Sequence, residues 1–237
     1  PYTCFGTSAT EECNYILKLI RYVNTSQAVV SYISYSSKDY ASTLTNTTNS
    51  TIKTYVDDWY KNNILNKKDS NNVSYSEYLT DNIFCNDRSI YRGDGYNLAV
   101  WSPYSPYNRT ALLFTPSLTC SQTSDKFTTS STLGNGKLTY PVGLITVDEV
   151  SLAGGKYRTN NDKYYLYTGK FWWTMSPYHF NNSNGKYHNF AVTSTGELNA
   201  GYGYANSKVR PVLNLKSDIL ISSGSGTYYR PYILKLN

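Results

Sequence analysis

Short β-prone segments separated by turn-forming residues fill the last third of the chain. They lie at residues 164–166, 171–174, 190–193, 197–200, 209–215 and 232–236. Runs of this length rich in aromatic and branched residues are typical of strands, and Gly or Asn between them marks turns. Thr195-Gly196 and residues 224–226 are the clearest such turns. This pattern predicts a fold built from short, twisted antiparallel strands.

Composition narrows the class of protein. The 237 residues include 26 Tyr, and only 16% are charged. Such a composition suits a β-rich or mixed fold with many exposed hydroxyl and amide groups, rather than a helical cytosolic enzyme. No shift in composition marks a linker, so we expect one α+β domain over residues 15–237 after a short segment, 1–14. The net charge of +6 is spread along the chain, which argues against nucleic acid as a partner.

The four cysteines predict disulfides rather than a metal site. None lies in a CxxC pair and the chain has only two histidines, so zinc is not expected. An even number of cysteines in a chain of this composition favours an oxidising, extracellular setting. We favour the pairs Cys4–Cys13, which would close segment 1–14, and Cys85–Cys120. Four reduced, buried thiols are the alternative.

Two features bear on location and cofactors. The chain shows no signal peptide and no apolar run of transmembrane length, so no membrane contact is expected. It opens on Pro1, and we expect an export signal or anchor upstream. Asp and Asn could supply oxygen ligands, but no EF-hand or other regular spacing occurs. No cofactor is therefore expected, with a structural calcium ion left open.

Apolar residues predict a helix over residues 50–63, with Asn49 or Ser50 as its N-cap. A short second helix is expected after Thr146, because Thr146 and Glu149 have the spacing of a capping box and Gly154 can end the element. Asp148 is assigned to this helix start rather than to an acid–base pair, since adjacent helical residues do not face each other. The first predicted helix would bury one face, made of Ile52, Tyr55, Val56, Trp59 and Tyr60.

Three other segments receive a prediction. Residues 15–23 and 27–34 are expected to form a hairpin around the polar residues 24–26, with a helix as the alternative for the first segment. Residues 83–85 resemble the end of a strand. Residues 93–117 are rich in Pro and are expected to be irregular.

Patterns typical of catalysis are missing from the sequence. There is no G-x-S-x-G nucleophile motif, and Gly93-Asp94-Gly95 has no phosphate-loop signature. His179 and His188 are not adjacent to a candidate Ser or Cys nucleophile. The sequence therefore favours a protein that is not an enzyme.

A series of motifs gives a resemblance. In chain order they are 147–155 (VDEVSLAGG), 164–167 (YYLY), 171–177 (FWWTMSP), 192–198 (VTSTGEL) and 209–215 (VRPVLNL). Together they resemble a bacterial family of secreted, often pilin-like surface proteins. These end in a C-type-lectin-like domain related to the formylglycine-generating-enzyme fold. The resemblance covers about residues 15–237.

The resemblance implies a display region at residues 176–208. In relatives diversified by retroelements, the segment between the WW-x-x-SP and VRP motifs is variable and lies on one exposed face. The chain departs from the pattern at Lys208, where relatives usually have Gly, and it lacks the late cysteine pair that the enzymes of this fold need. The implied binding residues are Tyr178, His179, Asn181, Asn182, Asn184, Tyr187, His188, Asn189, Asn199, Tyr202, Tyr204 and Asn206.

The apolar ends of this region predict anchors. We expect one of Trp172 and Trp173 to face the core, and Arg210, followed by Pro211, to hold a buried carboxylate or carbonyl group through its planar fork. Between these anchors, Tyr supplies rigid contact area while Ser, Gly and Asn supply adaptable hydrogen bonds, as in antibody paratopes. A merely soluble polar loop is the alternative.

These observations predict a ligand-binding domain of the adhesin or receptor type. It would belong to an extracellular surface or pilus protein. Its partner would be a protein or glycan on another cell, a phage or a host surface, or pilus subunits. One alternative is a structural pilus subunit that associates through an apolar patch. Another is a secreted enzyme that uses residues 93–117.

Overall fold

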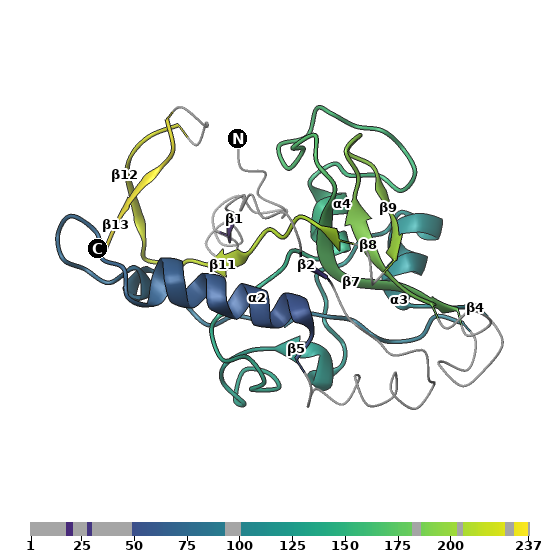
Figure 1. The fold of residues 1–237 in the computed structure, drawn as a ribbon, viewed down its shortest axis with the longest axis horizontal. Helices are drawn as coiled ribbons and strands as arrows, with labels where there is room; N and C mark the ends of the chain where they lie inside the picture. The colour runs from purple at the N-terminus through teal and green to yellow at the C-terminus, as the bar shows by residue number, and fades with distance from the viewer. Residues whose placement is uncertain are drawn as a thin grey trace.

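A computed structural model describes residues 18–20, 28–29, 49–92, 101–181, 186–202, 206–225 and 230–236. This part of the chain has a mixed α+β fold with few helices and curled antiparallel sheets. Figure 1 shows helix α2 (Thr51–Tyr60) on the left and a four-stranded sheet on the right. The strands of that sheet, in their order across it, are β4 (Trp101–Pro103), β7 (Trp172–Asn181), β8 (Lys186–Val192) and β9 (Leu198–Tyr202).

Both predicted helices are confirmed, together with their caps. The Ser50 hydroxyl accepts a hydrogen bond from the Lys53 amide at the start of α2. Helix α4 (Val147–Leu152) begins with the full capping box between Thr146 and Glu149 and is followed by Gly154 at φ +112°. The other helical segments are η2 (Lys61–Leu65), η3 (Tyr75–Tyr78), α3 (Ser105–Tyr107), η5 (Asn108–Leu113) and η6 (Thr123–Asp125).

The predicted N-terminal hairpin is described only in part, because its turn at residues 24–26 lies outside the described residues. β1 (Lys18–Ile20) pairs antiparallel with β11 (Val212–Asn214), and β2 (Ala28–Val29) pairs with β10 (Asn206–Ser207). The strand character was predictable from local composition, but the partners come from the far end of the chain. The remaining strands are β3 (Phe84–Cys85), β5 (Lys126–Phe127), β6 (Val142–Gly143), β12 (Leu220–Ser223) and β13 (Ile233–Lys235).

Two further local predictions need correction. Residues 164–166 form a turn rather than a strand. The apolar side chains of Tyr164 and Leu166 are nevertheless buried in the core. Residues 101–113, expected to be irregular, form β4, α3 and η5. β4 lies at the edge of this sheet, where proline is tolerated, and the Pro103 carbonyl accepts a hydrogen bond from the Tyr91 amide.

The strands β7 and β8 separate two hydrophobic clusters. Trp172 and Val192 face the cluster that contains α4, whereas Trp173 and Ala191 face the cluster that contains α2. Side chains alternate along a strand, so adjacent tryptophans reach opposite sides. Both tryptophans are 0% exposed. The expectation that only one of them faces the core is therefore wrong, since the sheet is covered on both sides here.

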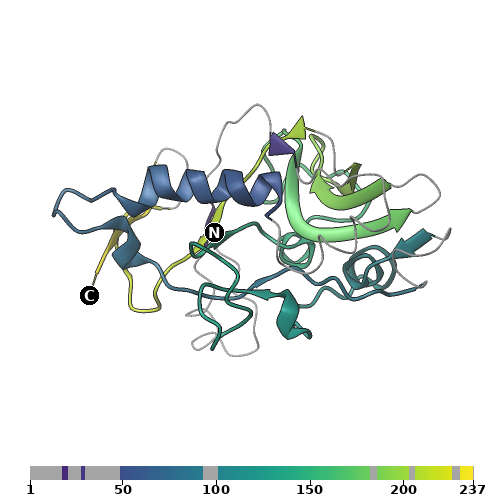
Figure 2. The same cartoon turned by 60° about the horizontal axis from the view of Figure 1, so that its bottom comes forward.

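The disulfide prediction is confirmed for Cys85–Cys120, which joins β3 to the segment before η6. The predicted Cys4–Cys13 pair lies outside the described residues. Figure 2 shows α2 beside the curved sheet, with the β12–β13 hairpin at the end of the molecule away from β9. The hairpin leaves Ile221 and Ile233 exposed. In the described part of the chain, no helix has the length and apolarity needed to span a bilayer.

Candidate binding face

A row of four rings crosses the β4–β7–β8–β9 sheet, with one ring from each strand. Trp101 on β4 lies 5.6 Å from His179 on β7, measured between ring centroids. His179 stacks on His188 of β8 at 4.2 Å and an interplanar angle of 16°. His188 in turn lies 4.6 Å from Tyr202 of β9. We call these four residues the ring row. It exists because cross-strand neighbours on one face of a sheet are within contact distance.

A β-bulge supplies a fifth ring to this face. Pro177 pairs with Asn189 and His179 pairs with His188, so Tyr178 is the extra residue on β7. A bulge places two residues of one strand opposite one residue of its partner and redirects side chains. Tyr178 consequently lies beside His179, with ring centroids 4.8 Å apart, and also packs on Phe190 at 4.8 Å.

Two more tyrosines join Tyr178 from other elements. Tyr107 of α3 and Tyr157, after α4, lie 5.9 Å apart and in edge-to-face contact. Tyr107 also touches Trp101 and Tyr178, at 5.3 and 4.9 Å. The hydroxyl groups of Tyr157 and Tyr178 are 2.5 Å apart. We call Tyr107, Tyr157 and Tyr178 the tyrosine cluster. It extends the ring row at the side of β4 and β7.

The structure divides the predicted display residues between two faces. His179, His188 and Tyr202 share the ring row, and the bulge brings Tyr178 beside them. Asn189 pairs with Gly201 and alternates with His188, so it faces the side of the sheet where Trp173 lies. Asn199 belongs to that side as well and donates a hydrogen bond to Glu197. A one-residue step along a strand changes the face.

The display residues are also less exposed than the sequence predicted. Four display residues were expected on an exposed face, yet the fold buries their side chains: Tyr178, His179, His188 and Asn189. Tyr202, at 45% exposed, is the display residue that reaches solvent most clearly among those described. The role of all these residues in ligand binding stays a prediction.

Several predicted residues cannot be placed in the face. Asn182, Asn184 and Tyr204 lie outside the described residues, and Asn181, Tyr187 and Asn206 are described only as positions on β7, β8 and β10. The anchors are clearer. Arg210 is buried, donates to the Leu166 carbonyl at 2.7 Å and lies over Trp172, so its predicted carbonyl partner is confirmed. Pro211, which follows it, is buried as well.

The ring row contains a buried imidazole with an unused polar atom. His179 Nδ1 has no hydrogen-bond partner in the described part of the structure. Burial, together with the neighbouring charge of His188, lowers the pKa of His179 from 6.5 to about 3. Burial also raises the pKa of Tyr178, and the Tyr157 hydroxyl adds to this effect. At neutral pH the His179 imidazole and the Tyr178 phenol are thus neutral.

This lowered pKa predicts a loss of stability in acid. The unfolded chain protonates His179 near pH 6.5, whereas the folded chain does so only near pH 3. The stabilising effect is complete above about pH 6.5 and is lost as the pH falls toward 3, because protons then favour the unfolded state. Urea unfolding gives the free energy of unfolding at several pH values between 7.5 and 4. This free energy should fall less steeply with decreasing pH for His179→Phe than for the wild type. Equal slopes would contradict the prediction.

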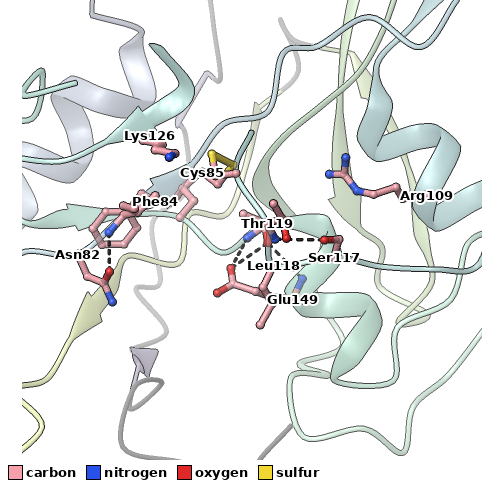
Figure 3. A pocket seen from close by; sticks show the side chains of 13 residues that line it. Asn82, Phe84, Cys85, Arg109, Ser117, Leu118, Thr119, Lys126 and Glu149 are labelled. Carbon is pink, nitrogen blue, oxygen red and sulfur yellow. Dashed lines mark hydrogen bonds between the residues drawn. A yellow bond between two sulfur atoms is a disulfide. The ribbon is translucent and has the colours of Figure 1, made fainter. Parts of the chain in front are cut away.

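A separate cavity of about 310 Å³ lies beside the Cys85–Cys120 disulfide. Figure 3 shows the disulfide, Glu149 and Arg109 on its walls. None of the predicted binding residues that the structure describes lines it. Its two charged groups other than Lys126 already have structural roles: Glu149 caps α4, and Arg109 forms ion pairs with Asp148 and Asp87. The ring row therefore remains the better candidate site.

Sequence reasoning missed Trp101, Tyr107 and Tyr157. The first two lie in the segment assigned to an irregular loop, and Tyr157 follows α4 and forms an isolated bridge with Leu198. A usable signal was present in the alternating WSPYSPY run at 101–107, whose aromatic residues are unusual for a solvated loop. Nothing in the sequence indicated that this run meets β7, because that contact depends on a distant strand pairing.

Searches for related proteins give no further assignment. Among the described residues, no group of three or more His, Cys, Asp or Glu side chains could hold a metal ion. A scan against family models, a search of curated proteins and a search of solved structures each return no match to this chain.

Proposed function

We propose that this chain is a non-enzymatic ligand-binding domain of the adhesin or receptor type, and that the ligand binds at the ring row. The observation that carries the proposal is the continuous line of ring contacts from Trp101 to Tyr202. Four separate strands contribute to it, so the rings are held in place before a ligand arrives. Preorganised aromatic groups give binding energy with little loss of conformational entropy.

The composition of the face supports recognition rather than catalysis. Aromatic side chains with a wet polar end are enriched where proteins bind partners. The buried members, His179 and His188, stack on each other, and His188 supports the exposed Tyr202 through a tilted ring contact. They act as the base of the site, and Tyr202 with the partly exposed Trp101 forms its contact surface.

We further propose that the scaffold is C-type-lectin-like and that the protein acts at a cell surface. The mixed α+β fold with curled antiparallel sheets is compatible with such a scaffold. The Cys85–Cys120 disulfide supports an oxidising compartment. The same proposal places diversified positions at 176–208. We expect diversification at the exposed positions of this segment, because substitutions at buried positions such as Asn189 would disturb the core.

The test is binding to an immobilised panel of neutral oligosaccharides, acidic oligosaccharides and peptides. Tyr202→Ala is expected to weaken the best binding reaction by about 10- to 30-fold, the range for loss of an aromatic contact at the centre of an interface. Tyr165→Ala is the matched control, because Tyr165 is also about half exposed and lies outside the face. No binding to any probe, or equal binding by Tyr202→Ala and wild type, would contradict the proposed function.

A further inference from the structure

Two arginines flank the tyrosine cluster. The guanidinium of Arg92 lies 5.5 Å from the ring centroid of Trp101, and that of Arg158 lies 5.1 Å from the ring of Tyr157. Tyr107 touches both of these rings and so lies between the two cations. Both arginine side chains are exposed. Neither has a carboxylate partner in the part of the chain that the structure describes.

The backbone at Arg158 supports a role beyond folding. Its φ is +48°, in the left-handed region that a long L side chain rarely adopts. Non-glycine residues held in this region are concentrated at functional sites, where the surrounding structure maintains the strain. Here the Arg158 amide is fixed by a hydrogen bond to the Leu198 carbonyl at 3.0 Å, which holds the side chain over Tyr157.

The hydroxyl groups near these cations can donate hydrogen bonds. Burial raises the pKa of Tyr107 although Arg158 and Arg92 act to lower it. Burial likewise raises the pKa of Tyr178, against the effect of Arg158. Both hydroxyls consequently keep their protons at neutral pH. Tyr107 therefore places a neutral phenol donor beside two guanidinium groups, a suitable environment for an anion, whereas the Tyr178 hydroxyl is already paired with that of Tyr157.

We propose that Arg92 and Arg158 bind the carboxylate of an acidic saccharide whose ring lies against Tyr107 and Tyr157. This inference rests on the proposed function, because it assigns a ligand class to the same face. A guanidinium pairs with a carboxylate through two parallel hydrogen bonds. The groups that reach solvent here are two guanidinium groups and two partly buried rings, whereas a stable protein partner needs about 800 Å² on each side. Charge complementarity therefore favours a small acidic ligand.

The experiment uses one saccharide in two forms: a uronic-acid oligosaccharide and the same oligosaccharide with its carboxyl groups reduced to alcohols. The wild type should bind the acid form more tightly. The variant Arg92→Gln/Arg158→Gln should lose about 10- to 100-fold in affinity for the acid form, as expected for charged hydrogen bonds, and little for the reduced form. Lys61→Gln/Lys67→Gln is the control, because it removes the same charge from the distant end of α2.

Arg158→Asn separates binding from folding. Asn tolerates the left-handed region, so the melting temperature should be unchanged or higher while affinity for the acid form falls. The inference is overturned if both saccharide forms bind equally, if neither binds while Tyr202-dependent binding to another probe persists, or if a glutamate-rich peptide binds better through the same arginines. In these cases the proposed function survives, because it depends on Tyr202. Absence of binding to every probe would remove both.

Discussion

Replacing Trp173 by alanine is expected to lower the free energy of unfolding by about 3–5 kcal/mol, the range for removing a large aromatic side chain from a core. Trp173 is 0% exposed and belongs to the cluster that joins α2 to the sheet. Its ring packs edge-to-face on Phe171 at 5.5 Å. Urea unfolding measures the change. Tyr165→Ala, which alters an exposed ring, should change stability by less than about 0.5 kcal/mol.

A second substitution, at Gly201, tests whether the Trp173 ring packs against β9 as described. A Cβ added at Gly201 would lie 2.3 Å from two atoms of the Trp173 ring, so Gly201→Ala should destabilise the wild type. In the Trp173→Ala background the same change should be nearly neutral, since the opposing atoms are gone. A double-mutant cycle gives the coupling between the two sites. Additive effects would show that β9 does not pack on Trp173 as described.

Asp148→Ala is expected to be equally damaging, with a loss of about 3–5 kcal/mol. Arg109 donates two hydrogen bonds to the Asp148 carboxylate, both at 2.9 Å, and a third to Asp87 at 2.6 Å. Burial alone would lower the pKa of Arg109, but these two carboxylates raise it above its ordinary value. Asp148 also accepts from the Ser117 amide, so its removal leaves several partly buried donors without their acceptor.

The control for this prediction is a pair of the same chemistry at the surface. Lys163 and Asp162 form an exposed ion pair, and Lys163→Ala should change the unfolding free energy by at most about 1 kcal/mol. The triple variant Asp148→Leu/Arg109→Met/Asp87→Asn should recover most of the stability, because it removes all three charges of the cluster rather than one. Failure of the triple variant to recover would show that Asp148 acts through Ser117 instead of Arg109.

Asp148 also shows where sequence reasoning reaches its limit. Its place in the first turn of α4 was predicted, and Glu149 does complete the capping box. The carboxylate of Asp148, however, turns inward and accepts a hydrogen bond from Arg109, which lies 39 positions away in the sequence. Local spacing shows that a residue begins a helix. It cannot show which distant side chain will lie opposite it.

What the sequence by itself determined are the features with local causes. The periodicity of residues 50–63 predicts α2 and its buried face, the Thr146–Glu149 spacing predicts the cap of α4, and the cysteine positions led to the Cys85–Cys120 bond. Phe190, Val192 and Leu198, the apolar residues between the polar positions of the display region, are all buried. Each of these depends on neighbours within a few residues or on the alternation of a single strand.

Only the tertiary structure decided how the binding face is composed. The bulge at Tyr178, the pairing of β4 with β7 and the split of His188 from Asn189 all depend on registers between distant strands. A shift of one residue in any of them would exchange the two faces of a strand. The sequence therefore proposed a segment for the site, and non-local packing selected which of its side chains meet at the candidate face and which are buried.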